Sequence, residues 1–260
     1  MNISDLTAVV LTFNEEQNIE RVLRSLDWLE AVCVVDSYST DATREICEKF
    51  RNVSFFQRKF DNHASQWNFA ISLVNTPWLL TLDADHVLDK IWKDAWIKCN
   101  GEFDAYLARF EYLLAGKKLR SSLYPPKIVL FRKGYGYFVQ DGHTQRIVIN
   151  GKIGFFPAKI YHDDRKKLQR WFFNQLKYSE LEAEKILHGS NTRFADLLRK
   201  TCWIMPVLII PYTLFIRGLI FDGIRGWIYA MQRLIAETLI ALLLLEKKLH
   251  EKEENSDLRD

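Results

Sequence analysis

The chain has 260 residues, and at about 150 residues per domain it forms one large domain, or one domain with an appendage. Hydrophobic residues make up 48% and charged residues 27%, a balance that excludes disordered, collagen-like and low-complexity proteins. With 36 Lys and Arg against 33 Asp and Glu, the net charge of +3 is too small for a dedicated nucleic-acid-binding protein, so we expect no nucleic-acid partner.

The first half of the chain alternates between short apolar runs of strand length and stretches in which apolar residues have helical spacing. This pattern predicts strands at residues 7–13, 31–36, 53–56 and 77–82, and helices at residues 18–26, 41–50 and 64–73. Strands and helices in this order require crossover connections, which predicts a mixed, mostly parallel α/β sheet with helices on both faces. Ligands bind outside the carboxyl ends of the strands in such sheets, so polar residues just past those ends are candidates for the site.

After residue 89 the apolar runs become shorter and are separated by Gly and Pro. We expect antiparallel strands that complete the same domain at residues 104–110, 127–131, 146–149 and 152–155. Residues 165–188 then predict a long amphipathic helix.

The last third of the chain carries long apolar stretches. Residues 203–221 approach the length of a minimal membrane span but contain two prolines and an arginine. Residues 228–245 are interrupted by Gln232, Arg233 and Glu237, which fall on one side of a helix. We expect an amphipathic helix that lies in the plane of a membrane surface. A spanning helix, or a helix buried in a protein core or interface, are the alternatives.

The four cysteines are scattered without a C-x-x-C pair, so the sequence shows neither a zinc knuckle nor a redox dithiol, and we expect reduced, buried thiols. Residues 1–5 lead into a short apolar run without a basic segment or a small-residue cleavage site, which is not the pattern of a secretory signal peptide. We therefore expect the chain in the cytoplasm.

An acidic pair follows the fourth predicted strand. Asp83 and Asp85 are separated by one residue and stand directly after the apolar run that ends at Leu82. Neighbouring carboxylates repel each other unless a cation is bound, and a hard divalent ion such as Mn²⁺ or Mg²⁺ is their natural partner. An ion held there neutralises a diphosphate, which a nucleotide-sugar leaving group requires. The same pattern also occurs on solvated loops, but this pair stands at the expected ligand-binding edge.

Polar side chains also follow the first and second predicted strands. Thr12, Phe13, Asn14 and Glu15 leave the first strand and offer an aromatic face and small polar acceptors for a base and a ribose. Asp36 ends the second strand, where its carboxylate can accept from a base N–H or a ribose hydroxyl. The alternative for Asn14, Glu15 and Asp36 is helix capping and turn formation. Their common edge with the acidic pair favours a nucleotide site.

Two other nucleotide-binding patterns are absent from the sequence. The first strand is not followed by G-x-G-x-x-G, and G-x-x-x-x-G-K-[ST] does not occur. Neither a classical dinucleotide-binding fold nor a P-loop NTPase is therefore supported. Diphosphate recognition must then come from a metal ion and from side chains.

Four segments of the first half resemble, in order, the motifs of family 2 glycosyltransferases, which have the GT-A fold and use nucleotide-diphospho-sugars. They are VLTFNEEQNI at residues 10–19, VDSYSTDAT at 35–43, QWNFA at 66–70 and LDAD at 82–85. Two later segments resemble a bacterial branch of that family that is associated with lipopolysaccharide core and other envelope glycans. These are DGHTQR at residues 141–146 and HDDRK at 162–166.

The resemblance implies a GT-A domain at residues 1–165, and the amphipathic, apolar pattern of the last third predicts a helical, membrane-associating region at residues 166–260. It also implies a metal site, a donor-nucleotide site and further contacts to the diphosphate or the acceptor. The expected metal ligands are Asp83, Asp85 and His162; the expected donor contacts are Thr12, Phe13, Asn14, Glu15, Asp36, Gln66 and Asp83; the candidates for diphosphate or acceptor contacts are His143, Arg165 and Lys166.

The same resemblance assigns two roles by position. Family members place a general base just before a helix in the acceptor half, often in a Glu-Asp pair, and Gln140 and Asp141 occupy that place here with one carboxylate. We expect Asp141 to be the general base, the alternative being ordinary Asp-Gly turn chemistry. His162, rather than His143, is the expected distant metal ligand. His86 stands where the family frequently has an acidic residue, and its role is open.

The function implied is a metal-dependent, inverting transfer of a sugar, expected to be a hexose from a UDP-sugar, to a hydroxyl of a membrane-linked glycan or glycolipid such as lipopolysaccharide core. We expect a peripheral enzyme on the inner face of the cytoplasmic membrane, and a homo-oligomer is compatible with the sequence. One alternative is a sugar nucleotidyltransferase, which attacks the α-phosphate and releases pyrophosphate. The other is a non-catalytic membrane-docking protein whose donor site has decayed.

Overall fold

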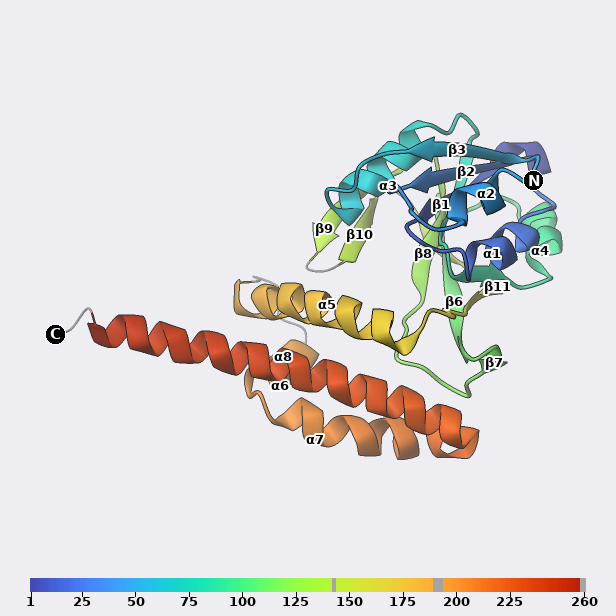
Figure 1. Ribbon diagram of the computed structural model, residues 1–260. Coiled ribbons are helices and arrows are strands. Elements are labelled where there is room, and N and C mark those ends of the chain that lie inside the picture. Colours follow the sequence, from blue (N-terminus) through green and yellow to red (C-terminus); the bar gives the residue numbers. More distant parts are fainter. Residues whose placement is uncertain (142–143, 189–193, 258–260) are drawn as a thin grey trace. The chain divides into compact units, whose positions relative to one another are not determined.

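The computed structural model describes residues 1–141, 144–188 and 194–257 (Figure 1). The chain forms two compact units, each assembled from more than one segment. The N-terminal unit comprises Met1–Lys118, Leu123–Gln140 and Thr144–Lys166, and the C-terminal unit comprises Leu119–Ser122, Asp141–His143 and Lys167–Asp260. The expected domain division at residue 165 remains a prediction.

One mixed sheet forms the centre of the N-terminal unit. Its strands are β1 (Leu6–Thr12), β2 (Ala31–Asp36), β3 (Val53–Gln57), β4 (Trp78–Asp83), β5 (His86–Leu88), β6 (Ala105–Leu114), β7 (Lys117–Lys118), β8 (Lys127–Arg132) and β11 (Ile153–His162). They lie in the order β3-β2-β1-β4-β8-β6-β11-β5, with β7 paired to β6. β1 to β4 run parallel to one another, as do β6 and β11, whereas β5, β7 and β8 run antiparallel to their partners. A separate two-stranded ribbon joins β9 (Gly136–Asp141) to β10 (Thr144–Ile149).

Helices cover both faces of this sheet. After a short turn η1 (Ile3–Asp5), the helices of this unit are α1 (Ile19–Ser25), α2 (Thr43–Cys47), α3 (His63–Ser72) and α4 (Trp92–Lys98). Side chains alternate across a strand, so Ala8 and Val10 of β1 pack in the core that contains α1, α2 and α4, whereas Val9 packs in the core that contains α3. The predicted mixed α/β sheet with helices on both faces is confirmed.

The second half of this unit differs from the short antiparallel pieces predicted for it. β11 is one strand that continues through Pro157, with an irregular register between Phe155 and Lys159. Proline cannot donate to the ladder, so the sequence pattern breaks there although the strand does not. β11 pairs in parallel with β6, and the elements β5, α4 and β9 occupy residues to which the pattern assigned nothing.

The C-terminal unit is helical. It contains α5 (Leu168–His188), α6 (Phe194–Lys200), α7 (Ile204–Pro211), the π-helical turn η2 (Tyr212–Ile216), the short turn η3 (Leu219–Asp222) and α8 (Ile224–Asp257). α8 packs against α5, α6 and α7. Among the described residues, Ile224–His250 is a helix long and apolar enough to cross a membrane by length and composition. Core helices of globular proteins share those two properties, so the environment of its side chains decides its role.

The apolar stretch at residues 203–221 is not one helix. Gly218 and Gly223 adopt φ angles of +71° and +58°, in the left-handed region where helices end. The chain reverses direction between them, and α7 and α8 therefore form a hairpin (Figure 1).

Candidate metal centre

The predicted acidic pair lies beside two histidines. β4 ends at Asp83, and Asp85 follows after one residue. The antiparallel register of β5 and β11 sets His86 opposite His162, with 5.3 Å between the ring centroids. Ligand atoms of Asp85, His86 and His162 all lie within 4.8 Å of one another. The ends of β4 and β11, distant in sequence, thus form one cluster.

Asp85 lies at the centre of this cluster. Its Oδ2 is 3.1 Å from Nε2 of His162, and its Oδ1 is 3.7 Å from Nε2 of His86. Oδ1 is buried and has no hydrogen-bond partner among the residues that the structure describes. Buried polar atoms are nearly always satisfied, and an oxygen that faces carboxylate and imidazole groups suits a divalent cation. The residues present therefore fit a metal ion.

Burial and neighbouring charges lower the pKa values of Asp85 and His86 and raise that of His162. Burial alone raises the pKa of Asp85, but the charge and hydrogen bond of His162 outweigh it and hold that pKa well below its usual range. Burial lowers the pKa of His162, yet Asp85 outweighs burial and the net shift is upward. Burial lowers the pKa of His86 to about 4, despite the nearby carboxylates. At neutral pH, Asp85 is therefore ionised and His86 is neutral.

The two histidines offer different atoms to a metal ion. The backbone N–H of Asp83 donates to Nδ1 of His86 at 3.1 Å, so the proton of neutral His86 is on Nε2. That N–H faces Oδ2 of Asp83 and Oδ1 of Asp85, each at 3.7 Å, and the hydroxyl of Tyr124 at 3.4 Å. Metal ligands must be deprotonated. His86 therefore suits a positioning role toward the acidic pair. Nε2 of His162 also carries a proton in this structure, because it donates to the carboxylate of Asp85. Nδ1 of His162 has no hydrogen-bond partner among the described residues, so that proton can move to Nδ1 and free Nε2 as a ligand.

Asp83 stands at the rim of the cluster. Its side chain is 44% exposed, compared with 14% for Asp85 and 16% for His162. An exposed carboxylate there can meet both an ion and a ribose hydroxyl. The three side chains of Asp83, Asp85 and His162 lie near one another, and their role as the ligand set remains a prediction.

Asn14 connects the loops that follow β1 and β2. Its φ of +53° lies in the left-handed region, which Asn tolerates better than most residues. Its Oδ1 accepts from the N–H of Thr40 at 2.7 Å, and its own N–H donates to Oγ of Ser39 at 2.7 Å. The turn role weighed for Asn14 is thus present in the fold. Phe13 beside it is 49% exposed and Thr12 is buried, and donor contacts by all three stay predictions.

Asp36 and Gln66 are buried and paired within the protein. The carboxylate of Asp36 accepts from the N–H of Ser39 at 2.8 Å, from its hydroxyl at 2.5 Å, and from Nε2 of Gln57 at 3.1 Å. Oε1 of Gln66 accepts from Arg58 at 2.6 Å. Both side chains shape the edge of the sheet, and a direct donor contact by either is untested.

Glu15 and Lys166 form a buried ion pair. Nζ of Lys166 is 2.5 Å from Oε1 of Glu15, and Nδ2 of Asn18 donates to the other oxygen at 2.8 Å. Burial raises the pKa of Glu15 from 4.5 to about 7, against the opposing effect of Lys166. Lys166, a candidate for diphosphate contact, is therefore held by Glu15 in this structure.

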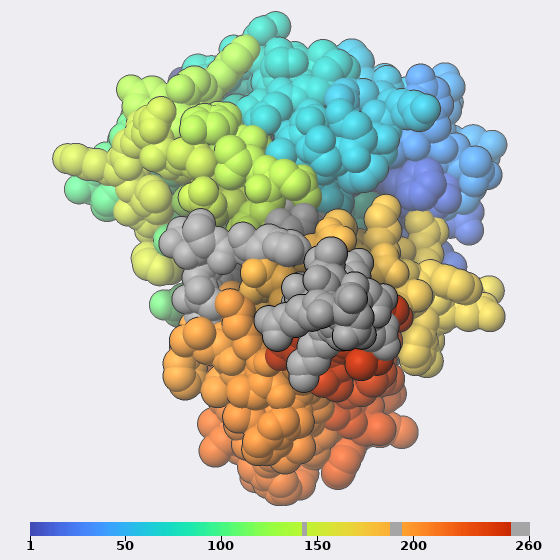
Figure 2. Space-filling view, turned by 90° about the vertical axis from the view of Figure 1, so that its left-hand side faces the viewer, coloured from blue at the N-terminus to red at the C-terminus, as the bar shows by residue number. Residues whose placement is uncertain are grey.

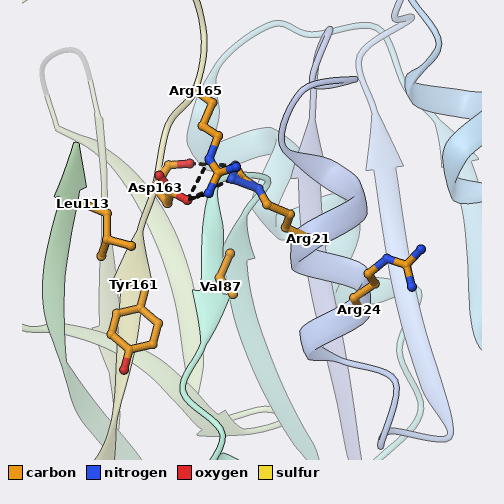
Figure 3. A pocket seen from close by; sticks show the side chains of 7 residues that line it. All are labelled: Arg21, Arg24, Val87, Leu113, Tyr161, Asp163 and Arg165. Carbon is orange, nitrogen blue, oxygen red and sulfur yellow. Dashed lines mark hydrogen bonds and ion pairs between the residues drawn. The ribbon is translucent and has the colours of Figure 1, made fainter. Parts of the chain in front are cut away.

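A separate pocket of about 300 Å³ lies on the other face of the β5–β11 pair (Figure 3). Val87 and Tyr161 pair across these strands and point away from the two histidines, because side chains alternate along a strand. Arg21 and Arg165 converge there on Oδ2 of Asp163, each at 2.8 Å. Arg165, another candidate for diphosphate contact, is thus held by Asp163.

Asp141 ends β9 and belongs to the C-terminal unit. Its Oδ1 lies 2.7 Å from Nζ of Lys185 in α5. The next described element is β10, so the expectation that Asp141 directly precedes a helix is wrong. Its role as general base remains a prediction. His143 lies outside the described residues.

Comparison with known proteins identifies relatives along most of the chain. The model of the family described as "Glycosyl transferase family 2" matches residues 7–97. An uncharacterized glycosyltransferase of Rickettsia felis is 34% identical over 262 residues, which cover 94% of this chain and 92% of that protein. The lipopolysaccharide core biosynthesis glycosyltransferase LpsC of Rhizobium meliloti is 25% identical over 254 residues, which cover 93% of this chain and 92% of that protein.

A solved structure shares the fold at low sequence identity. It is the mannosyltransferase PcManGT from Pyrobaculum calidifontis in complex with GDP-Man and Mn²⁺, with a TM-score of 0.54 and 14% identity. The match covers 95% of this chain and 88% of that one. At this identity the likeness shows the fold alone.

Replacing His162 with Gln is expected to remove most of the Mn²⁺ affinity, because a ligand is lost. Replacing His86 with Gln is expected to weaken binding by about 10–100-fold, the usual effect of losing a partner that orients the ligands. Calorimetric titration of the full chain with Mn²⁺ measures both. His63→Gln, which alters a histidine that contacts Phe60, is the control. Unchanged affinity in His162→Gln contradicts the assignment.

Glu15→Gln is expected to flatten the pH dependence of stability between pH 4.5 and about 7, the ordinary and shifted pKa values of Glu15. In that window the folded protein binds more protons at Glu15 than the unfolded chain, so wild-type stability falls as pH rises, by up to about 3 kcal/mol. Urea unfolding at several pH values measures the slope.

The exposed carboxylate Glu20 on α1 provides the control for this experiment, because its side chain is 51% exposed. Glu20→Gln should keep the wild-type slope. An identical slope in Glu15→Gln and wild type is the contrary result.

Proposed function

This chain belongs to glycosyltransferase family 2, and we propose that it transfers a sugar, with inversion, from a nucleotide-diphospho-sugar to a hydroxyl of a membrane-linked glycan or glycolipid such as lipopolysaccharide core. The observation that carries the proposal is the contact between Asp85 and His162 beside Asp83, at the carboxyl end of β4. The acceptor class is supported by the name of the Rhizobium meliloti relative. UDP is the nucleotide we expect, and a hexose the sugar.

Asp83, Asp85 and His162 hold a divalent ion, Mn²⁺ or Mg²⁺, in this proposal. When bound, the ion supplies positive charge to the diphosphate as its negative charge develops. The buried, unpartnered Oδ1 of Asp85 supports a cation there. Nε2 of His86 lies 3.7 Å from one carboxylate oxygen of each of Asp83 and Asp85, a position from which it is proposed to orient both carboxylates. The name of the archaeal mannosyltransferase, which mentions Mn²⁺, is in keeping with this choice of ion.

The donor nucleotide lies along the edge formed by the ends of β1, β2 and β4. The exposed ring of Phe13 offers a face for the base, and Asp83 offers a carboxylate for the ribose. Thr12 ends β1, and Asn14 and Glu15 follow in the next loop. Asp36 and Gln66 support this edge from the interior through their hydrogen bonds. Arg165 and Lys166 are proposed to bring positive charge to the diphosphate or an anionic acceptor, for which Arg165 has to leave Asp163 and Lys166 has to leave Glu15.

In the transfer step the acceptor hydroxyl oxygen attacks the anomeric carbon and forms the new glycosidic bond. The bond from that carbon to the diphosphate oxygen breaks, and its electron pair leaves with the nucleoside diphosphate. Asp141 accepts the hydroxyl proton. Its Oδ1 lies 2.7 Å from Nζ of Lys185, a contact that holds the carboxylate in one orientation. A single displacement of this kind inverts the configuration at the anomeric carbon.

The enzyme works at the inner face of the cytoplasmic membrane in this proposal, attached through the C-terminal unit. Support comes from the apolar helix Ile224–His250 and from a membrane-linked acceptor. Peripheral attachment keeps the site of the N-terminal unit in the compartment that supplies nucleotide-sugars.

The function is tested by incubating the full chain with a panel of nucleotide-sugars, Mn²⁺ and a bacterial glycolipid extract. We expect release of a nucleoside diphosphate together with labelled glycolipid, and no turnover by a folded Asp85→Asn variant. Release of pyrophosphate instead indicates a nucleotidyltransferase. Absence of calorimetric heat with UDP and Mn²⁺ favours a non-catalytic protein.

Asp141→Asn is expected to lower kcat by about 10²–10⁴-fold, the range that a general base contributes. Donor affinity should stay unchanged, because the proposed role of Asp141 concerns the acceptor. Steady-state kinetics and UDP titration separate the two effects. Asp27→Asn, at an exposed surface position after α1, is the matched control. A kcat of Asp141→Asn within twofold of the control removes Asp141 from the mechanism.

A further inference from the structure

The outer face of the helix formed by α7 and η2 is apolar and exposed. Val207, Leu208, Tyr212, Phe215 and Ile216 have exposed fractions of 63%, 48%, 41%, 64% and 76%. The pair Val207 and Leu208 is followed by Tyr212 and then by the pair Phe215 and Ile216. This recurrence every three to five residues places the five side chains on one stripe of the helix. In Figure 2 the stretch coloured orange, which includes these residues, forms part of the outer surface of the C-terminal unit.

The first turns of α8 carry a second stripe of the same kind. Ile224, Trp227, Ile228 and Met231 are 74%, 48%, 43% and 47% exposed and follow the spacing i, i+3, i+4, i+7. Phe221, in the turn between the helices, is 74% exposed. We define the apolar tip as the exposed residues at the closed end of this hairpin: Tyr212, Phe215, Ile216, Phe221, Ile224, Trp227 and Ile228.

The tip is tightly built despite its exposure. A Cβ on Gly226 would lie 1.8 Å from the carbonyl oxygen of Leu219, so α8 approaches η3 closely at this point. Asp222 accepts the backbone N–H of Arg120 at 2.9 Å, and the guanidinium of Arg120 lies 5.3 Å from the ring centre of Phe221. The exposed side chains therefore stand on a fixed framework.

The charged side of α8 faces inward. Glu237 is 2% exposed, and Arg199 of α6 contacts its two carboxylate oxygens at 2.6 and 2.8 Å. Arg199 also lies 3.2 Å from Asp196 and 3.7 Å from Glu182, and Arg233 lies 3.4 Å from Glu237. The polar side of the predicted amphipathic helix is thus part of the interior of the unit. Removing one member of such a network leaves a buried, unpaired charge. Separating α8 from these partners would therefore cost free energy.

This inward network decides between crossing a membrane and lying on it. To cross alone, α8 would separate Glu237 from Arg199 and carry it into hydrocarbon, where charged groups are costly. To cross together with its partners, α8 would take α5, whose 21 residues include several charged side chains, into the bilayer. The geometry favours contact through the apolar tip, with α8 retained in the helical unit.

The charge around the tip points to an anionic lipid surface. Between residues 201 and 236 the acidic residue is Asp222, which is paired with Arg120. The basic residues near the tip are Arg217 and Arg225, whereas Arg233 belongs to the internal network around Glu237. Tyr212 and Trp227 on the tip are of the types that concentrate at membrane–water interfaces. Apolar side chains flanked by arginines fit the interfacial zone of a leaflet that contains anionic phospholipid.

We propose that the apolar tip inserts into one leaflet of an anionic phospholipid bilayer and that α8 does not cross it. The inference deepens the proposed function, on which it rests for a membrane-linked acceptor. It names the hairpin end at residues 212–228, rather than the predicted segment 228–245 as a whole, as the membrane contact.

The test compares the full-length wild type with Ile216→Glu/Ile224→Glu in a vesicle flotation assay. Both isoleucines are about three-quarters exposed, so the substitutions should leave the fold intact. The matched control is Ile153→Glu/Phe155→Glu, two exposed apolar positions on β11. Vesicles of phosphatidylcholine with phosphatidylglycerol are compared with phosphatidylcholine alone.

We expect wild type and control to float with the mixed vesicles, and the tip variant to bind about tenfold or more weakly. Carbonate extraction of membranes from expressing cells should release the wild type. The proposal is overturned if the wild type does not float, or if all three proteins float equally. It is also overturned if carbonate fails to release the wild type from membranes. A tip variant that still floats but no longer self-associates would show that the tip is a contact between protein copies.

Donor binding separates this proposal from the proposed function. UDP titration in the presence of Mn²⁺ should give the same affinity for wild type and tip variant, because the tip lies outside the metal cluster. A wild type that floats but does not bind any nucleotide contradicts the proposed function alone. A wild type that transfers sugar but does not float contradicts the tip alone.

Discussion

The contact between the Asp85 carboxylate and the His162 imidazole depends on how β5 pairs with β11. β5 has three residues, and its register with β11 sets His86 against His162 beside the end of β4. A shift of β5 by one residue would set Val87 against His162 and turn His86 to the opposite face. The chemistry of the acidic pair is therefore specified by a strand too short to be recognised from its own sequence.

The sequence was sufficient for the first half of the fold because each element there is encoded locally. Apolar runs of strand length and helical spacing predicted β1 to β4 and α1 to α3 within a few residues. Later elements depend on tertiary pairing. β5 is stabilised by β11, and β11 itself contains Pro157, so neither shows the period that marks an independent strand.

The candidate site was predictable in composition but not in detail. The sequence predicted Asp83, Asp85 and His162 as metal ligands, a prediction that the structure leaves open while bringing His162 against Asp85. The tautomer of His86 depends on a hydrogen bond from the backbone of Asp83, which the sequence does not show. The same limit applies to α8. A helical wheel places Arg233 and Glu237 on one side, but only the partner helices decide that this side is buried. The sequence predicted an amphipathic helix on a membrane surface, whereas these polar side chains form an internal ion-pair network.

His162 is the proposed imidazole ligand of an ion shared with Asp85, and pulsed EPR of Mn²⁺ bound to the full chain measures this directly. This assignment predicts a hyperfine coupling from one imidazole nitrogen that is lost in His162→Gln and retained in His86→Gln. A wild-type spectrum without nitrogen coupling, or a coupling that persists in His162→Gln, would contradict it.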